Sequence, residues 1–234
     1  MRMNEPAAAK RPSEHRWPAA TALLIALAMY ATSPAIFVPW FHIAVVGIGL
    51  LLLVPLLIVN PVRFTRESRW SRPAALTQAI ILFGANQIAI VVLITILLNP
   101  DAETSGQRLL LGAAQVWATN VIATALVLWE LDRGGPVTRS TAKREDLPVA
   151  DLRFAQDEDH DAIDEVAQRS SGLADWRPTF VDYLYSSLSN SMAFSASDSI
   201  PLSARAKMLM GLQALSGFVI LALVIARAVS LLGG

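Results

Sequence analysis

Residues 177–210 read RPTFVDYLYSSLSNSMAFSASDSIPLSARAKMLM. Apolar or small residues recur at helical spacing from Phe180 to Ser191, but this stripe is too short and too polar to cross a bilayer. Residues Met192 to Ser199 show no period, and Pro201 begins a turn. An uncharged run from Met208 to Ala226 follows and is long enough to span a membrane. The stretch therefore predicts a short amphipathic helix, an irregular segment and a spanning helix.

The composition places most of the chain in lipid. The 234 residues are 54% hydrophobic and only 16% charged, whereas a soluble domain has roughly 25% charged residues. Four further uncharged stretches are long enough to span a bilayer: Ala19–Val38, Phe41–Val59, Ala75–Leu98 and Leu109–Leu128. We therefore predict an all-α, polytopic transmembrane bundle of about five spanning helices, with one short re-entrant or interfacial helix.

The charged and polar links divide the chain into four parts. Residues 1–17 form a basic, polar tail that we expect to be disordered, and residues 18–131 form a four-helix transmembrane region. Residues 132–176 form a hydrophilic, acidic loop that is too poor in apolar residues to bury a core of its own. Residues 177–234 complete the chain. Because Pro34 directly follows the only small-residue site for cleavage, we expect the first apolar segment to be retained.

The distribution of lysine and arginine predicts the orientation. With the N-terminus in the cytoplasm, the tail, the link after the second span and the long loop lie inside, and 17 of the 19 basic residues lie there. Only Arg108 and Arg227 then face outward. This asymmetry is the one that the positive-inside rule describes. We expect a multi-pass protein of the bacterial inner membrane with a cytoplasmic N-terminus.

The sequence lacks the residues that several classes of chemistry require. The chain has no cysteine, and its three histidines, His15, His42 and His160, are far apart. No span carries an ionisable residue near its middle, although ion-coupled pumps commonly need one. We find no catalytic constellation, and we expect no enzyme activity, no cofactor, no metal site and no nucleic-acid partner.

The acidic loop carries a partial likeness to a calcium-binding loop. Asp157, Asp159 and Asp161 alternate as the first ligands of an EF-hand do. The turn glycine and the bidentate glutamate of that motif are replaced by Ala162 and Gln168. We therefore interpret the segment as a solvated acidic loop.

Polar side chains occur within the predicted spans, and they permit two interpretations. An amide that faced lipid would be left without partners, so these side chains should point inward and bond across helices. The same residues would also line a polar pathway. The intramembrane amides are Gln78, Asn86, Gln115, Asn120 and Gln213.

The C-terminal stretch resembles the pore module of potassium channels, in which a pore helix leads into Thr-Val-Gly-Tyr-Gly-Asp, a proline turn and an inner helix. Asp198 matches the terminal aspartate, and residues 193–197 occupy the filter. Ser195 and Ser197 replace the filter glycines, whose backbone conformations disfavour other residues, so potassium selectivity is not implied. The resemblance implies a path lined by Asn190, Ser195, Ser197 and Asp198.

The chain also resembles an uncharacterised family of bacterial integral membrane proteins. The motifs of that family match residues 129–136, 176–185, 193–198, 201–202, 206–210 and 226–229. Ala196 stands where the family pattern has proline. The resemblance covers roughly the last half of the chain, and it implies a membrane fold and location without an activity.

These observations leave two functional hypotheses. The first is a channel-like homo-oligomer with a degenerate pore loop, since one such loop cannot enclose a pore. The second is a non-conducting scaffold or regulatory protein that binds a cytoplasmic partner through residues 132–176. The predicted orientation brings residues 177–198 to the cytoplasmic side, whereas a potassium-channel pore loop enters from outside. The segment is therefore re-entrant from the cytoplasm or interfacial, or one span is miscounted.

Overall fold

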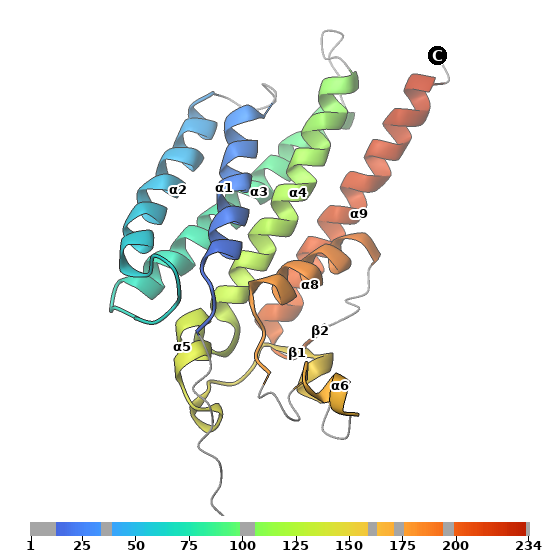
Figure 1. Ribbon diagram of the computed structural model, residues 1–234. Helices are drawn as coiled ribbons and strands as arrows, with labels where there is room; N and C mark the ends of the chain where they lie inside the picture. Colours follow the sequence, from blue (N-terminus) through green and yellow to red (C-terminus); the bar gives the residue numbers. More distant parts are fainter. Residues whose placement is uncertain are drawn as a thin grey trace, which may run out of the picture.

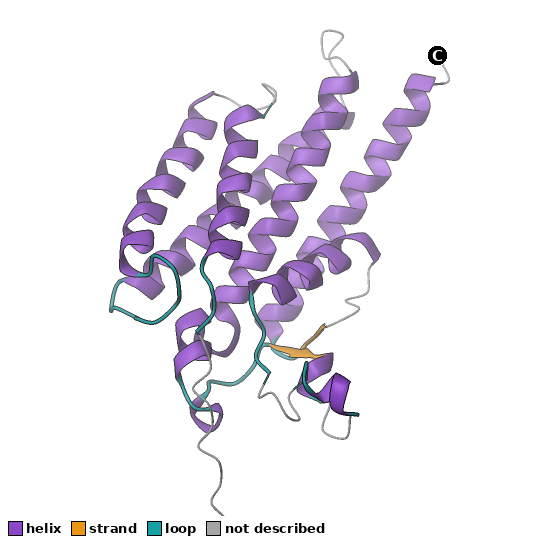
Figure 2. Ribbon diagram, in the orientation of Figure 1, coloured by secondary structure: helices purple, strands orange, loops and turns teal. Residues whose placement is uncertain are grey.

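Figure 1 shows the computed structural model, which describes residues 13–33, 39–98, 106–158, 163–170, 176–193 and 199–232. The long helices are α1 (Trp17–Thr32), α2 (Pro39–Val59), α3 (Ser71–Leu98), α4 (Gly106–Leu131) and α9 (Ala204–Leu232), and α8 (Phe180–Ala193) crosses them obliquely. The short elements are α5 (Pro136–Thr141), α6 (Asp164–Ala167), the strands β1 (Leu152–Phe154) and β2 (Ser199–Pro201), and 3₁₀ turns at Asp132–Gly134, Arg144–Asp146 and Ala155–Asp157. The prediction of an all-α transmembrane bundle is confirmed, and Figure 2 shows how small the sheet is.

Four of the described helices, α2, α3, α4 and α9, are long and apolar enough to cross a membrane. The first predicted span corresponds to α1, which has 16 residues and a length of about 24 Å. Residues 34–38, which were expected to extend it, lie outside the described part of the chain. α1 is therefore shorter than the other four, and its role as a fifth span stays a prediction.

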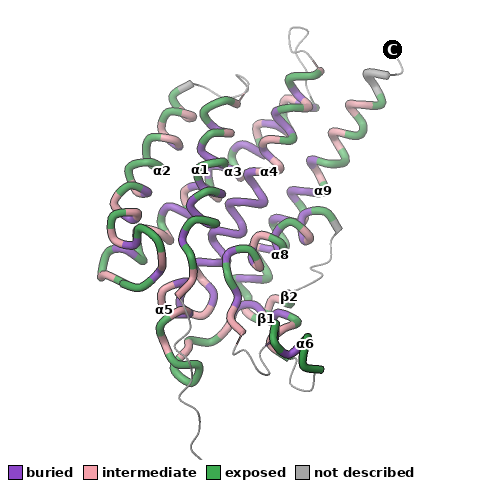
Figure 3. The backbone as a smooth tube through the Cα atoms, viewed as in Figure 1, coloured by how far each residue is buried: buried purple, intermediate pink, exposed green. Residues whose placement is uncertain are grey.

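Helix α4 is the central helix of the bundle. In its most apolar window 61% of the residues are buried, against 22–39% in the other three long helices. One apolar cluster packs α4 with α1, α2, α3 and α8, and a second packs it with α3 and α9. Figure 3 shows the buried residues concentrated along α4 and the exposed ones on the outer faces. The exposed side chains include Ile43, Leu51 and Ile58 of α2, as expected for helices that face lipid.

Three segments rich in arginine meet at one end of the bundle, which we call the basic end (Figure 1). They are residues 13–16, 60–70 and the described parts of residues 132–179. The first two pair through their backbones: Arg16 N donates to Val62 O at 3.0 Å, and Phe64 N donates to Glu14 O at 3.1 Å. Residues 13–16, which the sequence assigns to a disordered tail, are therefore part of the packed structure.

Residues 132–158, 163–170 and 176–179 form a cap on the basic end. α4 ends at Leu131, and the turn after it contains Gly134 and Gly135, whose φ angles of 81° and 88° lie in the left-handed region that glycine accepts. β1 then pairs antiparallel with β2, with Leu152 opposite Pro201. Leu152 and Phe154 join the larger apolar cluster of the bundle. The loop gains its order by sharing the core of the membrane helices, which is how a segment too small for its own core can be structured.

Helix α8 begins at the basic end, and the chain is again at the basic end in β2, after residues 194–198. Its first residue, Phe180, packs edge-to-face on Trp129 near the end of α4, and the chain resumes after residues 194–198 in β2, beside the start of α9. The other end of α8 lies against the middle of α9, because Ser191 O would be only 2.7 Å from a Cβ at Gly217. Gly217 is 13 residues beyond Ala204, or about 20 Å along the helix axis.

The contact between α8 and α9 predicts different effects for two glycines of α9. Alanine raises helix propensity by up to about 1 kcal/mol over glycine, and at Gly211 nothing lies within 4 Å of the new Cβ. At Gly217 the backbone of Ser191 obstructs it, and overpacking costs about 1–3 kcal/mol. We expect Gly217→Ala to lower the thermal unfolding temperature of the protein in detergent and Gly211→Ala to leave it unchanged or raise it. Equal shifts in both variants would contradict the close approach of α8.

Candidate functional site

A buried carboxylate joins the bundle to its cap. The side chain of Asp132, at the end of α4, is fully buried. Its Oδ1 accepts hydrogen bonds from the backbone N–H groups of Asp151 (2.6 Å) and Leu152 (3.2 Å), and its Oδ2 accepts one from the Tyr183 hydroxyl (2.5 Å). Since buried charges are stable only when hydrogen-bonded or paired, these donors hold α4, β1 and α8 in one arrangement.

A second buried group pairs Glu14 with Arg139. Arg139 of α5 is only 1% exposed, and its Nη1 donates to the carbonyl oxygens of Trp129 (2.7 Å) and Asp132 (2.6 Å). Glu14 Oε1 accepts from Trp129 Nε1 (3.1 Å) and Phe180 N (2.7 Å), and its Oε2 lies 4.0 Å from Arg139 Nη2. Burial raises the pKa of Glu14, and the charge of Arg139 opposes this increase. The chain before α1 is thereby bound to α4, α5 and α8.

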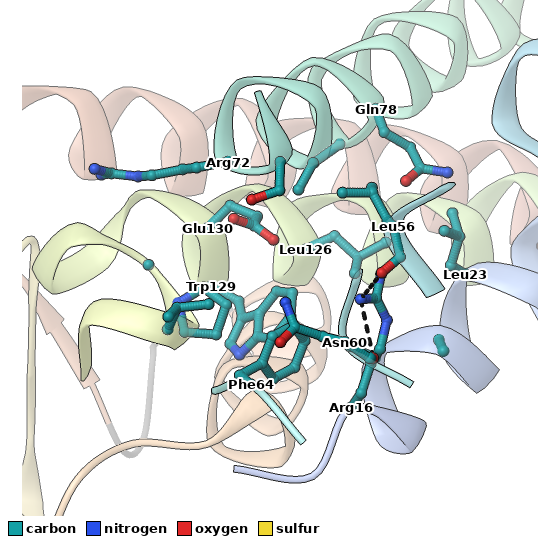
Figure 4. A pocket seen from close by; sticks show the side chains of 18 of the residues that line it. Arg16, Leu23, Leu56, Asn60, Phe64, Arg72, Gln78, Leu126, Trp129 and Glu130 are labelled. Atoms are coloured by element: carbon teal, nitrogen blue, oxygen red, sulfur yellow. Dashed lines mark hydrogen bonds between the residues drawn. The ribbon is translucent and has the colours of Figure 1, made fainter. Parts of the chain in front are cut away.

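A pocket of about 710 Å³, open solvent at its mouth included, lies among the basic ends of α1, α2, α3 and α4. We call it the inner pocket (Figure 4). Its walls are mainly apolar, and they also carry Arg16, Arg72, Gln78 and Glu130. Arg16 crosses the pocket to donate to the carbonyl oxygens of Leu56 and Asn60.

Glu130 is the most unusual group in the inner pocket. It is only 6% exposed, and within the described residues it has no hydrogen bond and no ion pair within 4 Å. The guanidinium groups of Arg139, Arg72 and Arg16 interact with its charge at longer range. The pocket therefore holds a carboxylate whose oxygens are available to water or to a ligand.

A band of buried polar side chains, which we call the polar seam, lies deeper in the bundle between α3, α4, α8 and α9. Asn86 Oδ1 accepts from Thr119 Oγ1 (2.6 Å) and from the Tyr30 hydroxyl (3.4 Å). Gln87 Nε2 donates to Asn120 Oδ1 (3.3 Å), and Gln87 Oε1 accepts from Ser216 Oγ (3.4 Å). These bonds link α3 to α1, α4 and α9 through neutral groups.

The C-terminal part of the seam is formed by α8 and α9. Gln213 Nε2 donates to the Ser187 carbonyl (2.9 Å) and hydroxyl (2.5 Å), while its Oε1 accepts from Asn190 Nδ2 (2.9 Å). Asn190 Nδ2 also donates to Met210 O (2.8 Å), and Ser187 Oγ donates to Val121 O of α4 (2.7 Å). These bonds hold α8 against both neighbouring helices.

The two faces of α8 are reversed relative to a helix on a soluble protein. The buried face is mainly polar, with Ser186, Ser187, Asn190 and Ser191, whereas the exposed face is apolar, with Val181, Tyr185, Leu188 and Met192. A surface helix of a soluble domain turns its apolar stripe inward. The reversed pattern fits a helix whose outer face contacts lipid.

Several buried atoms of the seam have no partner among the described residues. They are Asn86 Nδ2, Gln115 Oε1, Asn120 Nδ2, Thr124 Oγ1 and Ser186 Oγ. Native proteins satisfy the large majority of buried polar atoms, often with internal water. This concentration of unused donors and acceptors therefore indicates positions for water molecules.

The residues expected from sequence to be functional fall into four groups. Gln115 is partly buried, and its Oε1 has no hydrogen-bond partner among the described residues. Gln78, Asn86, Asn120 and Gln213 are buried and bonded across helices, Gln78 through its Nε2 to Gly49 O at 2.7 Å. Asn190 is buried and bonded to α9 within the same chain. Ser195, Ser197 and Asp198 lie outside the described residues.

The acidic loop offers no metal site in the part of the chain that the structure describes. Asp157 is paired with Arg133 (2.5 Å) and Arg144 (3.6 Å). Asp159 and Asp161 lie outside the described residues, as does His160.

Sequence reasoning missed Glu14, Glu130, Asp132 and Arg139 as members of one buried region. Each lies next to a predicted membrane boundary, where charged residues are interpreted as topology signals. Two signals were present in the sequence. Glu130 and Asp132 flank Leu131 directly after an uncharged span, and Glu14 lies between Arg11 and Arg16 in the tail.

Two tyrosines of α8 provide a test of the junction at Asp132. Tyr183→Phe removes the hydroxyl that donates to the buried carboxylate and should destabilise the protein by about 2 kcal/mol. Tyr185 is half exposed, so Tyr185→Phe should change stability by less than about 0.5 kcal/mol. Thermal unfolding of the two variants in the same detergent measures the difference. Equal stability of the two variants would show that Tyr183 does not support the junction.

Comparisons with known proteins found no relative of this chain. No protein-family model matches the chain. No curated protein and no solved structure matches it either. The function therefore has to be argued from the site itself.

Proposed function

We propose that the protein is a channel-like membrane protein that conducts water or a monovalent cation along the polar seam, with α8 as a re-entrant helix. The observation that carries the proposal is the reversed polarity of α8 together with its depth. An interfacial helix turns its polar face to water, whereas α8 turns that face to α4 and α9. Its end lies beside Gly217 in the middle of α9, well inside a hydrocarbon core of about 30 Å.

The unpartnered atoms of the seam support conduction over simple helix association. Polar side chains that serve only to join helices need no spare donors or acceptors. Here Thr124, Ser186 and the Nδ2 atoms of two asparagines remain without partners among the described residues. Water at these positions would form the start of a hydrated path.

The inner pocket supplies a candidate entrance to that path. Gln78 lines the pocket, and Asn86 of the seam lies two turns farther along α3, about 12 Å away along the axis. Leu82 is buried between these two residues. We interpret the structure as a closed state in which apolar side chains separate the pocket from the seam.

The orientation forms part of the proposal. The basic end carries the three arginine-rich segments, and the positive-inside rule assigns such an end to the cytoplasm. We therefore propose that the N-terminus, the cap and the inner pocket face the cytoplasm of a bacterial cell. The homo-oligomer and the pore-lining role of Ser195, Ser197 and Asp198 stay predictions, because residues 194–198 lie outside the described part of the chain.

A scaffold or regulatory role is the second candidate, and the order of the cap favours it. Asp151 binds Arg205 at the start of α9 through two hydrogen bonds of 2.7 and 2.5 Å, and it accepts a third from Ser203. A cap held so firmly to the last helix could transmit binding of a cytoplasmic partner to the bundle.

Flux through the purified protein in liposomes tests the first candidate. We expect osmotic water permeability or potassium flux above that of protein-free liposomes. Thr124→Val keeps the shape of the side chain and removes a hydroxyl without a described partner, so it should lower flux several-fold without lowering the unfolding temperature. Asp198→Asn should change flux if residues 194–198 lie on the path.

The matched control is Thr95→Val, on the exposed face of α3. It makes the same chemical change away from the seam and should leave flux unaltered. Absence of water, sodium and potassium flux from folded protein would reject conduction and favour the scaffold role. Equal flux in wild type and Thr124→Val would exclude the seam as the path.

A further inference from the structure

A second pocket lies inside the cap, between the turn that follows α4, helix α5 and the loop residues 176–178 that lead into α8. It encloses about 540 Å³, open solvent at its mouth included. We call it the cap pocket. Four of its lining residues are arginines, Arg133, Arg139, Arg144 and Arg177, and one is a carboxylate, Asp157.

The charges around the cap pocket leave it positive. Asp157 is shared between Arg133 and Arg144, and it also accepts a hydrogen bond from Phe154 N (3.0 Å). Asp132 and Glu14 lie behind the pocket and are already bonded to neutral donors, and Glu130 interacts with Arg139 at longer range. The lining itself carries four guanidinium groups and one carboxylate, which leaves it positive.

Arg139 has hydrogen-bond donors to spare in this pocket. Its Nη1 holds two backbone carbonyls. Its Nε and Nη2 are buried and have no hydrogen-bond acceptor among the described residues, and Glu14 lies at the 4.0 Å limit of an ion pair. The Nη1 of Arg133 is likewise buried without a hydrogen bond, 3.5 Å from Asp132.

A buried guanidinium N–H without an acceptor lowers the stability of the folded protein. A tetrahedral anion offers several oxygens, which can accept from two or more N–H groups of an arginine at once. We propose that the cap pocket binds a phosphate group. This inference does not depend on conduction, because it concerns a different pocket and a different ligand.

The remaining lining residues indicate the chemical nature of the group to which the phosphate is attached. Leu147, Pro148, Trp176 and Pro178 supply apolar walls beside the arginines. A phosphate monoester or diphosphate with an apolar or planar body fits such a pocket better than a bare ion. The phosphate has two sources, a soluble metabolite of the cytoplasm or the head group of an anionic phospholipid.

Pyrophosphate is the first probe, used with the full chain in detergent or in nanodiscs of zwitterionic lipid. We expect saturable binding by calorimetry and a rise in unfolding temperature with ligand concentration. ATP is the second probe and should bind at least as tightly. Nanodiscs that contain an anionic phospholipid distinguish the sources: lost pyrophosphate binding there assigns the pocket to a head group, and retained binding assigns it to a soluble ligand.

Arg144→Gln and Arg153→Gln form a matched pair of variants. Both side chains are nearly half exposed, at 46% and 42%, and both pair with an acidic residue of the cap. Only Arg144 lines the pocket. Loss of one charged hydrogen bond should weaken pyrophosphate binding about tenfold in Arg144→Gln, while Arg153→Gln should bind as wild type does.

Two results would overturn the proposal. One is the absence of saturable binding at millimolar pyrophosphate. The other is equal weakening in both variants, which would indicate a general effect of net charge. If Arg144→Gln does not fold, Arg144→Lys replaces it: it keeps the charge, loses the planar fork, and should bind with intermediate affinity.

Discussion

The carboxylate of Asp132 is the group on which the basic end of the molecule depends. It receives two backbone N–H groups from the start of β1 and the hydroxyl of Tyr183 from α8. Asp151, the residue whose N–H it accepts, in turn binds Arg205 and Ser203 at the start of α9. The carboxylates of Asp132 and Asp151 therefore fix the relative positions of α4, β1, α8 and α9. Removing a partner of either carboxylate would leave a buried charge uncompensated.

With that end fixed, the position of α8 follows from the requirements of lipid. A polar face can enter the membrane only if it is covered by protein or water. α4 and α9 cover it through Ser187 and Gln213, and the absence of a side chain at Gly217 permits the close contact. The same packing leaves an apolar stripe from Val181 to Met192 on the outside.

Much of the fold could be predicted from the sequence because lipid imposes a simple rule on hydropathy. Helices α2, α3, α4 and α8 begin and end within a few residues of their predicted bounds, as α3 shows by starting at Ser71 in place of Ala75. The charged cluster was not predicted, because Glu14 lies far in sequence from Glu130, Asp132 and Arg139 and because charges at membrane boundaries are expected as topology signals. β1 and β2 are too short to leave a pattern, and the partners of Asn190 are the Met210 carbonyl and the Gln213 side chain of α9, which no sequence motif indicates.

The pairing of β1 with β2 sets an order for the assembly of the protein. β1 precedes α8 in the chain, whereas β2 and the start of α9 follow it. The polar face of α8 has no cover on one side until α9 has been synthesised and inserted. During translation α8 therefore lacks part of its cover until α9, the last long helix to emerge, completes the burial of its polar face. A chain truncated before α9 would expose that polar face and become a substrate for membrane proteolysis.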